Sequence, residues 1–449
     1  MLYMISVLNH LLPLNGSKII LIISIGLFYA GCGIFKPAGK TPERPSDVTS
    51  EERVESPVVE PIDTIEWVLI PESEITPIRS RRTPMVTKFK DTYNLVLLAP
   101  FNAGAATSFS ARTNQLIHFY SGVRYGLTYH TPDIDIKLTV IDTDDELFSG
   151  NLESIPAIRD ADVFIGPYFS QDLERFADYA KAKQKILISP WNSETAAREN
   201  PFFIQLRPSL SVHSEKITEY VLSRFRLNEI KLVCKNSEYD KSVLRYFQRA
   251  SQNILADDTL HYLPELVIDN ISDRNLFGHL RVLIQEQDVK AFIVPNWQDP
   301  SFILSFLSKL NFAKADSVLE VYGFPQWIDM ERMDYSYYEN LNVHVTSSSP
   351  MRYSGSLADQ FRKDFFSIYG TLPETDAYYG FDVIRLISFL LKHEGTLIIN
   401  GLTRALPDDL FNQFEFQGRF GVNGESIDYF ENVFVRMYRF NQFRFYPVD

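Results

Sequence analysis

The sequence predicts an α/β protein with two lobes, each built on a mostly parallel, doubly wound sheet. Short apolar runs, several of them closed by Pro or Gly, recur along residues 94–323, as expected for strands buried on both faces. Helical patterns separate these runs, and such alternation is typical of parallel sheets covered by helices. The alternation of strand and helix patterns starts again after residue 209. A chain of 449 residues is long enough for two to three domains. Two successive α/β units are therefore expected.

The first unit contains four expected strands, which cover residues 94–100, 135–142, 162–167 and 185–190. Its first helix carries apolar residues at helical spacing from Leu116 to Leu127, and a second helix covers residues 171–183. Gly122 and Gly126 lie four residues apart on the first helix. This spacing indicates close packing of that helix on the sheet.

The second unit repeats the pattern. Its expected strands cover residues 230–234, 263–268, 291–295 and 318–323. Its expected helices cover residues 213–226, 240–254, 275–287 and 300–311. A cleft between two such lobes is a common place for a ligand.

Composition and motifs argue against several functions. A net charge of −13 and a pI near 5.2 argue against nucleic acid as the main partner. Two cysteines cannot form a disulfide scaffold or a four-thiolate zinc site, and Cys234 in its apolar run is expected to be a buried thiol. The eight histidines show no metal-ligand spacing, and the common hydrolase, zinc-protease and nucleotide-binding motifs are absent. A non-enzymatic protein without a metal or cofactor is expected.

The N-terminus predicts export. Residues 19–30 form a run of twelve nearly all apolar residues after Lys18. The run is too short to span a bilayer and fits the core of a signal peptide covering residues 1–31. Residues 29–32, with the sequence YAGC, resemble the bacterial lipobox, in which the cysteine, here Cys32, is lipidated. Gly33 is not the acidic residue of the familiar inner-membrane retention signal, which favours the outer membrane over the inner. A signal anchor or an ordinary signal peptide is the alternative.

Residues 32–91 are expected to form a tether. Eight of the 24 prolines lie in residues 33–91, and 19 of the other 51 residues there are Ser, Thr or Glu. Such a composition buries too little apolar surface to offset the entropy of ordering. Residues 64–70 break the pattern with Trp67 and several aliphatic residues. They are expected either to dock as a strand on the folded body or to contact a partner.

The order of landmarks along residues 92–449 resembles the type I periplasmic binding proteins, the family of leucine/isoleucine/valine-binding receptors. The most specific match is residues 162–170, DVFIGPYFS. Further landmarks are residues 97–100, 119–123, 142–143, 188–190, 200–203, 207–208 and 416–421, the last as a glycine-bearing turn.

The resemblance implies three crossovers between lobes that close on a ligand by hinge motion. It places residues 92–209 and 342–398 in the first lobe, with a helix at 376–391. It places residues 210–341 and 399–449 in the second lobe.

Candidate ligand-binding residues of the first lobe follow two of its strands. Tyr168, Phe169 and Ser170 precede a helix whose N-terminus can hold an anion, and the resemblance implies that this position grips an α-carboxylate. Ser170 could instead be only the N-cap of that helix. Trp191, Asn192 and Ser193 follow the next strand, where the family commonly has small residues and a threonine. The bulky Trp191 and Asn192 would reshape or fill the pocket.

The second lobe offers three more candidates. Tyr239 matches a family tyrosine that closes over the ligand, although Asp240 replaces the glycine that usually follows. Asn296 and Asp299 follow another strand, and Asp299 could hold an ammonium group. Asp299-Pro300 is also a good helix start, and this cap is the favoured interpretation.

The expected function is a lipid-anchored periplasmic solute-binding protein. It would capture a small polar, amino acid-like ligand in the inter-lobe cleft and deliver it to an ABC-type permease. The alternative is a non-enzymatic interaction lipoprotein of the same fold, such as an activator of a peptidoglycan synthase.

Overall fold

The computed structural model describes residues 86–103, 110–129, 134–144, 148, 150–191, 199–256, 262–331, 333–404, 406–421 and 426–448. The predictions for the signal peptide, Cys32, most of the tether and the Trp67 segment lie outside these residues, and so do Asn192 and Ser193. Within the described residues, no helix is long and apolar enough to cross a membrane.

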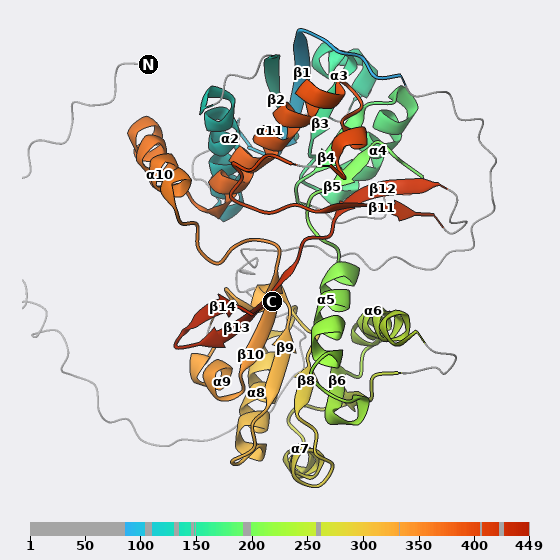
Figure 1. Ribbon diagram of the computed structural model, residues 1–449, viewed down its shortest axis with the longest axis vertical. Helices are drawn as coiled ribbons and strands as arrows, with labels where there is room; N and C mark the ends of the chain where they lie inside the picture. The colour runs from blue at the N-terminus through green and yellow to red at the C-terminus, as the bar shows by residue number, and fades with distance from the viewer. Residues whose placement is uncertain are drawn as a thin grey trace, which may run out of the picture. The chain divides into compact units, whose positions relative to one another are not determined.

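The first lobe is built on a seven-stranded sheet with the order β11-β12-β5-β4-β3-β1-β2 (Figure 1). Its strands are β1 (Thr92–Ala99), β2 (Asp135–Asp142), β3 (Val163–Ile165), β4 (Ile186–Ser189), β5 (Phe203–Gln205), β11 (Phe416–Phe420) and β12 (Ile427–Asn432). All neighbouring strands are parallel except the pair β11 and β12. The expected strand over residues 135–142 has the same bounds in the structure.

Helices cover both faces of this sheet. Helices α2 (Ala111–Tyr129) and α11 (Thr375–Glu394) lie on one face, and α3 (Pro156–Asp160) and α4 (Ser170–Lys183) lie on the other. Helix α10 (Ser356–Tyr369) packs on α2 and α11. Short 3₁₀ turns cover Leu152–Ser154 and Ile398–Gly401. Successive β1 residues alternate between two hydrophobic clusters, with Leu97 in the cluster of α2 and α11 and Leu98 in the cluster of α3 and α4. This two-sided burial explains the continuous apolar strand sequences.

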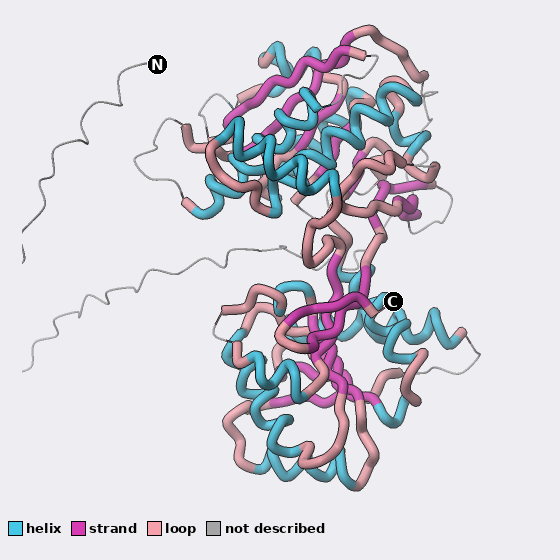
Figure 2. The backbone as a smooth tube through the Cα atoms, turned by 60° about the vertical axis from the view of Figure 1, so that its left-hand side comes forward, coloured by secondary structure: helices cyan, strands magenta, loops and turns pink. Residues whose placement is uncertain are grey.

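The second lobe repeats this design with the strand order β14-β13-β10-β9-β8-β6-β7. Its strands are β6 (Ile230–Lys235), β7 (Glu265–Ile268), β8 (Ala291–Ile293), β9 (Glu320–Gly323), β10 (Val343–Ser347), β13 (Arg436–Asn441) and β14 (Arg444–Pro447). Strands β6 to β10 are parallel, whereas β13 and β14 are antiparallel additions. Figure 2 shows helices flanking the strands of this sheet.

The helices of the second lobe are α5 (Leu210–Leu222), α6 (Glu238–Leu255), α7 (Asn275–Gln285), α8 (Pro300–Ala313) and α9 (Tyr335–Asn340). Two 3₁₀ turns cover Leu227–Glu229 and Pro325–Trp327. Cys234 is buried in the core, as expected, and burial raises the pKa of its thiol to about 11.

The chain passes between the lobes three times, after β5, after β10 and after β12, so the expected number of crossovers is confirmed. The expected boundaries were wrong in two places. Strand β10 belongs to the second lobe rather than to the first-lobe segment 342–398, because Val343 and Val345 are buried in the second-lobe core. Strands β11 and β12 belong to the first lobe rather than to the second-lobe segment 399–449, because Phe416 and Phe430 are buried in the first-lobe core. The predicted turn at 416–421 is therefore mainly strand β11.

The two helix glycines pack against another helix and not, as predicted, against the sheet. A Cβ atom on Gly122 would lie 1.9 Å from the carbonyl oxygen of Ala377 in α11. One on Gly126 would meet Ile384 and Phe381 of the same helix. Gly380 of α11 faces α2 in turn, since its Cβ would lie 2.0 Å from Phe119 O. Because these glycines have no side chains, the backbones of α2 and α11 can approach closely.

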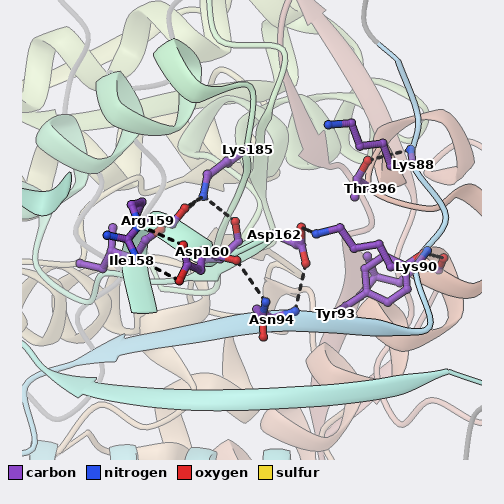
Figure 3. Close-up of polar contacts among 12 residues, drawn as sticks. Lys88, Lys90, Tyr93, Asn94, Ile158, Arg159, Asp160, Asp162, Lys185 and Thr396 are labelled. Carbon is purple, nitrogen blue, oxygen red and sulfur yellow. Dashed lines mark hydrogen bonds and ion pairs between the residues drawn. The ribbon is translucent and has the colours of Figure 1, made fainter. Parts of the chain in front are cut away.

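The folded body begins earlier than the predicted tether end at residue 91. Lys88 N–H donates to Thr396 Oγ1 at 3.0 Å, and Lys90 Nζ lies 2.5 Å from Asp162 Oδ1. Asp162 also accepts from Asn94 N–H at 3.0 Å, as Figure 3 shows. These contacts hold residues 88–91, which include the residues just before β1 in the sequence, against the first lobe.

Candidate functional site

The first group of candidate residues lies where β3 ends. Gly166 and Pro167 follow the strand through a cis peptide bond, and Gly166 N–H donates to Ile188 O at 2.8 Å. Helix α4 starts at Ser170, with Phe169 at the N-cap and no side-chain capping bond. The alternative prediction that Ser170 is the N-cap was therefore wrong, since Ser170 is the first helical residue.

A cation that the sequence analysis did not identify lies beside this helix start. The guanidinium carbon of Arg112, from α2, is 5.2 Å from the ring centroid of Phe169 and 6.0 Å from that of Tyr168. The two aromatic rings meet edge to face at 5.3 Å. Arg112 and Phe169 are far apart in sequence, so local patterns gave no signal of this contact. A guanidinium near a helix N-terminus favours an anionic group there.

Trp191 lies after β4 and is half-buried against the first-lobe core. Its ring centroid is 4.8 Å from that of Phe119 and 5.4 Å from that of Tyr168. The structure therefore brings Trp191 and Tyr168 together, as their positions after neighbouring strands predict. The indole forms part of an aromatic surface at the carboxyl edge of the sheet.

In the second lobe, Tyr239 lies in the first turn of α6. Its ring meets that of Trp297 edge to face at 6.0 Å, and Gln298 Nε2 donates to its hydroxyl at 3.1 Å. Burial and the neighbouring Asp240 raise the pKa of Tyr239 to about 12, so the phenol is protonated at neutral pH. Tyr239 therefore offers an aromatic face and a hydroxyl.

Asn296 and Asp240 belong to one polar network. Asn296 Nδ2 donates to Asp240 Oδ1 at 2.8 Å, and Asn296 Oδ1 accepts from Asp299 N–H at 3.0 Å. Ser237 caps α6 by accepting from Asp240 N–H at 3.0 Å. Asp240, which stands where the family usually has a glycine, is thus hydrogen-bonded to Asn296 after the neighbouring strand β8.

Asp299 is the N-cap of α8, as favoured from the sequence, and its Oδ1 accepts from Phe302 N–H at 2.9 Å. Its other oxygen lies 2.6 Å from Lys235 Nζ. Burial acts to raise the pKa of Asp299, but the bonds from Lys235 and Phe302 N–H outweigh it and lower the pKa. Lys235 therefore already neutralises the carboxylate that was considered for a ligand ammonium.

Gln326 is a further residue that the sequence analysis missed. It lies in the 3₁₀ turn after β9, and both polar atoms of its amide are buried without a hydrogen-bond partner among the described residues. Next to it, Trp327 Nε1 donates to Asn296 O at 2.8 Å. Buried amides without a hydrogen-bond partner are rare in folded proteins. No hydrophobic pattern or motif distinguishes this glutamine in the sequence.

No group of three or more His, Cys, Asp or Glu residues in the described part of the chain could hold a metal ion. The arrangement at the two strand edges offers aromatic faces, hydroxyls, an amide and a guanidinium. Such groups suit recognition of a polar molecule by hydrogen bonds and ring contacts.

Comparison with known proteins agrees with this architecture. Residues 129–294 match the family model of the receptor family ligand binding region. No curated protein matches the sequence.

Several solved structures share the fold. A putative branched-chain amino acid ABC transporter protein from Rhodospirillum rubrum has a TM-score of 0.57 at 12% identity, covering 79% of this chain and 100% of its own. A Desulfitobacterium hafniense ABC transporter substrate-binding protein, solved in complex with Leu, has a TM-score of 0.51 at 13% identity, covering 80% and 100%. Full-length LpoA from Haemophilus influenzae has a TM-score of 0.53 at 13% identity, covering 81% of this chain and 60% of LpoA.

At these identities the solved structures establish the fold alone. The fold and the family match together confirm the resemblance to the type I periplasmic binding protein family. The chain has the two-lobed α/β fold of these structures.

Proposed function

We propose that the chain is a membrane-tethered extracytoplasmic solute-binding protein. It captures a small polar, amino acid-like ligand between its lobes and delivers it to an ABC-type permease. The ligand is held by noncovalent contacts alone, without catalysis, metal or cofactor.

The observation that carries the proposal is the position of the candidate side chains at the carboxyl ends of parallel strands. Tyr168 follows β3, Trp191 follows β4, Tyr239 follows β6 and Asn296 follows β8. Ligands of open α/β sheets bind beyond these strand ends. Each lobe therefore supplies candidate contacts to a ligand from the edge of its sheet where the parallel strands have their carboxyl ends.

The contacts also suggest which ligand groups are recognised. Arg112 beside the start of α4 suits a carboxylate of the ligand. Because Lys235 neutralises Asp299, the amide of Gln326 is the better partner for the ligand's other polar end. A ligand with one carboxylate and one group that both donates and accepts hydrogen bonds fits this set.

Thermal unfolding of the full chain tests the proposal against a panel of amino acids, their derivatives and other small polar metabolites. A ligand at 100 times its Kd should stabilise the fold by about 2.7 kcal/mol. The shift should be lost in Tyr239→Ala and Gln326→Ala and retained in Tyr262→Ala, whose side chain is 52% exposed. No shift across the panel would contradict the proposal.

A second candidate is a non-enzymatic interaction protein of the same fold, for example an activator of a peptidoglycan synthase. It is favoured by Trp191, which packs on Phe119 and Tyr168 where related receptors commonly have small residues. Affinity capture from a cross-linked cell envelope should then recover a cell-wall enzyme. Recovery of transport permeases alone would contradict this candidate.

The proposed anchor is a lipid on Cys32, placing the protein in the periplasm and favouring the outer membrane over the inner. Incorporation of labelled fatty acid should be lost in Cys32→Ser. It should persist in Cys234→Ala, because Cys234 is buried in the folded core. Labelling that survives Cys32→Ser would contradict the anchor.

A further inference from the structure

A pocket of about 530 Å³ lies within the second lobe and is lined by none of the candidate residues described above. Its walls come from the loop after β7, from α8 and from the start of α9. Figure 1 places α8 and α9 in the same lobe. A volume of this size is within the range of small-molecule sites, about 300–1,000 Å³.

Two opposite charges line this pocket without pairing. Lys309 of α8 has no ion pair or hydrogen bond within the described residues. Asp334 caps α9 by accepting from Ser336 N–H at 2.9 Å, and this bonding to Ser336 lowers the pKa of Asp334. Asp334 also forms no ion pair with any described residue. The pocket is therefore lined by a lysine and an aspartate side chain that form no ion pair within the described residues.

The remaining surface is partly aliphatic and partly hydroxylic. Leu304 and Ile271 line the pocket and pack against the second-lobe core, which holds them in place. The hydroxyl of Tyr337 donates to Ser308 Oγ at 3.2 Å, which joins α9 to α8 across the pocket wall. Apolar side chains of a ligand would gain burial on the aliphatic part.

We propose that this pocket is a second binding site, which takes a short zwitterionic peptide with aliphatic side chains. The peptide carboxylate pairs with Lys309, its ammonium pairs with Asp334, and its side chains lie on Leu304 and Ile271. The proposal goes beyond the solute-binding function and does not depend on it, since no residue is shared between the two sites.

The test uses leucyl-leucine as the probe and methyl NMR of the full chain labelled at Ile and Leu. The methyl signals of Ile271 and Leu304 should shift on titration. Lys309→Met should weaken leucyl-leucine binding about tenfold or more, because a charge-assisted contact is lost. It should leave the affinity for leucyl-leucinamide, which lacks the carboxylate, unchanged.

Asp334→Asn tests the other end of the probe. Asn preserves the capping oxygen of α9, so the lobe should remain folded. This variant should weaken binding of leucyl-leucine but not of N-acetyl-leucyl-leucine, which lacks the ammonium. Lys363→Met, at an exposed position on α10, should bind leucyl-leucine like the parent chain.

Two results would overturn the inference. One is the absence of shifts at Ile271 and Leu304 at saturating leucyl-leucine. The other is equal affinity of the parent, Lys309→Met and Asp334→Asn for this probe. Unfolding temperatures recorded for each variant separate loss of the site from loss of the fold.

Discussion

The indole of Trp191 lies 4.8 Å from the ring of Phe119, and this contact joins the end of β4 to helix α2. Replacing Trp191 by Ala removes a half-buried aromatic side chain from the first-lobe core. The free energy of unfolding should therefore fall by about 1–3 kcal/mol.

Chemical denaturation measures this loss. Phe312→Ala, at a side chain that is 69% exposed, should change the free energy of unfolding by less than about 0.5 kcal/mol. Equal stabilities of the two variants would show that the Trp191 contact does not support the fold.

The α2–α11 contact predicts the effect of adding one methyl group. Gly122→Ala and Gly380→Ala place a Cβ atom about 2 Å from a backbone oxygen of the facing helix. The helices must move apart, so each change should cost about 1–3 kcal/mol or more. Thermal unfolding measures this cost.

Gly278→Ala is the matched control, because nothing lies within 4 Å of the added Cβ in α7. It should stabilise the chain by about 0.5–1 kcal/mol through higher helix propensity. Stabilisation by all three alanines would rule out the close helix approach.

These glycines also mark a limit of sequence-based prediction. The spacing of Gly122 and Gly126 correctly indicated close packing, but nothing local identified α11, more than 250 residues later, as the partner. Strand β2 and the Asp299 cap were predictable because periodicity and capping chemistry are local signals. The lobe boundaries at β10 to β12 depend on strand pairing over long sequence distances, which local patterns do not encode.

Prediction of the candidate site was limited in the same way. The alternation of strands and helices allowed us to infer that its residues lie at strand ends. The sequence did not allow us to predict the pairing of Asp299 with Lys235 or the unsatisfied amide of Gln326, because both depend on how separate strands align.

The side chain of Glu431 in β12 connects two of the chain segments that pass between the lobes, the one after β5 and the one after β12. Its Oε1 accepts from Ser209 N–H at 2.7 Å, immediately before α5, while its Oε2 pairs with Arg419. The Glu431 side chain is 1% exposed. Glu431→Ala leaves Arg419 without its carboxylate and should destabilise the chain by about 3–5 kcal/mol.

Urea unfolding of the variants measures this effect. Glu238→Ala, at a side chain that is 97% exposed, should change stability by less than about 0.5 kcal/mol. An unfolding midpoint of Glu431→Ala at the parent value would contradict the role of this carboxylate.

Two buried histidines predict loss of stability in acid. Burial lowers the pKa of His213 from 6.5 to about 3 and that of His344 from 6.5 to about 4. Between pH 6.5 and these values the unfolded chain binds protons that the folded chain does not. Stability should therefore fall with pH in this window, by up to about 1.4 kcal/mol per pH unit for each residue.

The variant His213→Asn keeps a polar partner for Thr346, to which His213 Nδ1 is bonded at 2.9 Å. It should reduce the pH dependence of the unfolding free energy between pH 6.5 and 4.5, whereas His279→Asn on the surface serves as control. An unchanged slope in His213→Asn would contradict this assignment.

Isothermal titration of the ligand found by the thermal screen tests the central proposal most directly. The parent chain and Tyr262→Ala should bind it with the same Kd. Tyr239→Ala in the second lobe and Trp191→Ala in the first should each change the Kd by about tenfold or more, since a ligand held by both strand edges contacts both lobes. Unchanged affinity in both of these variants would contradict a binding site formed by the carboxyl ends of the two sheets.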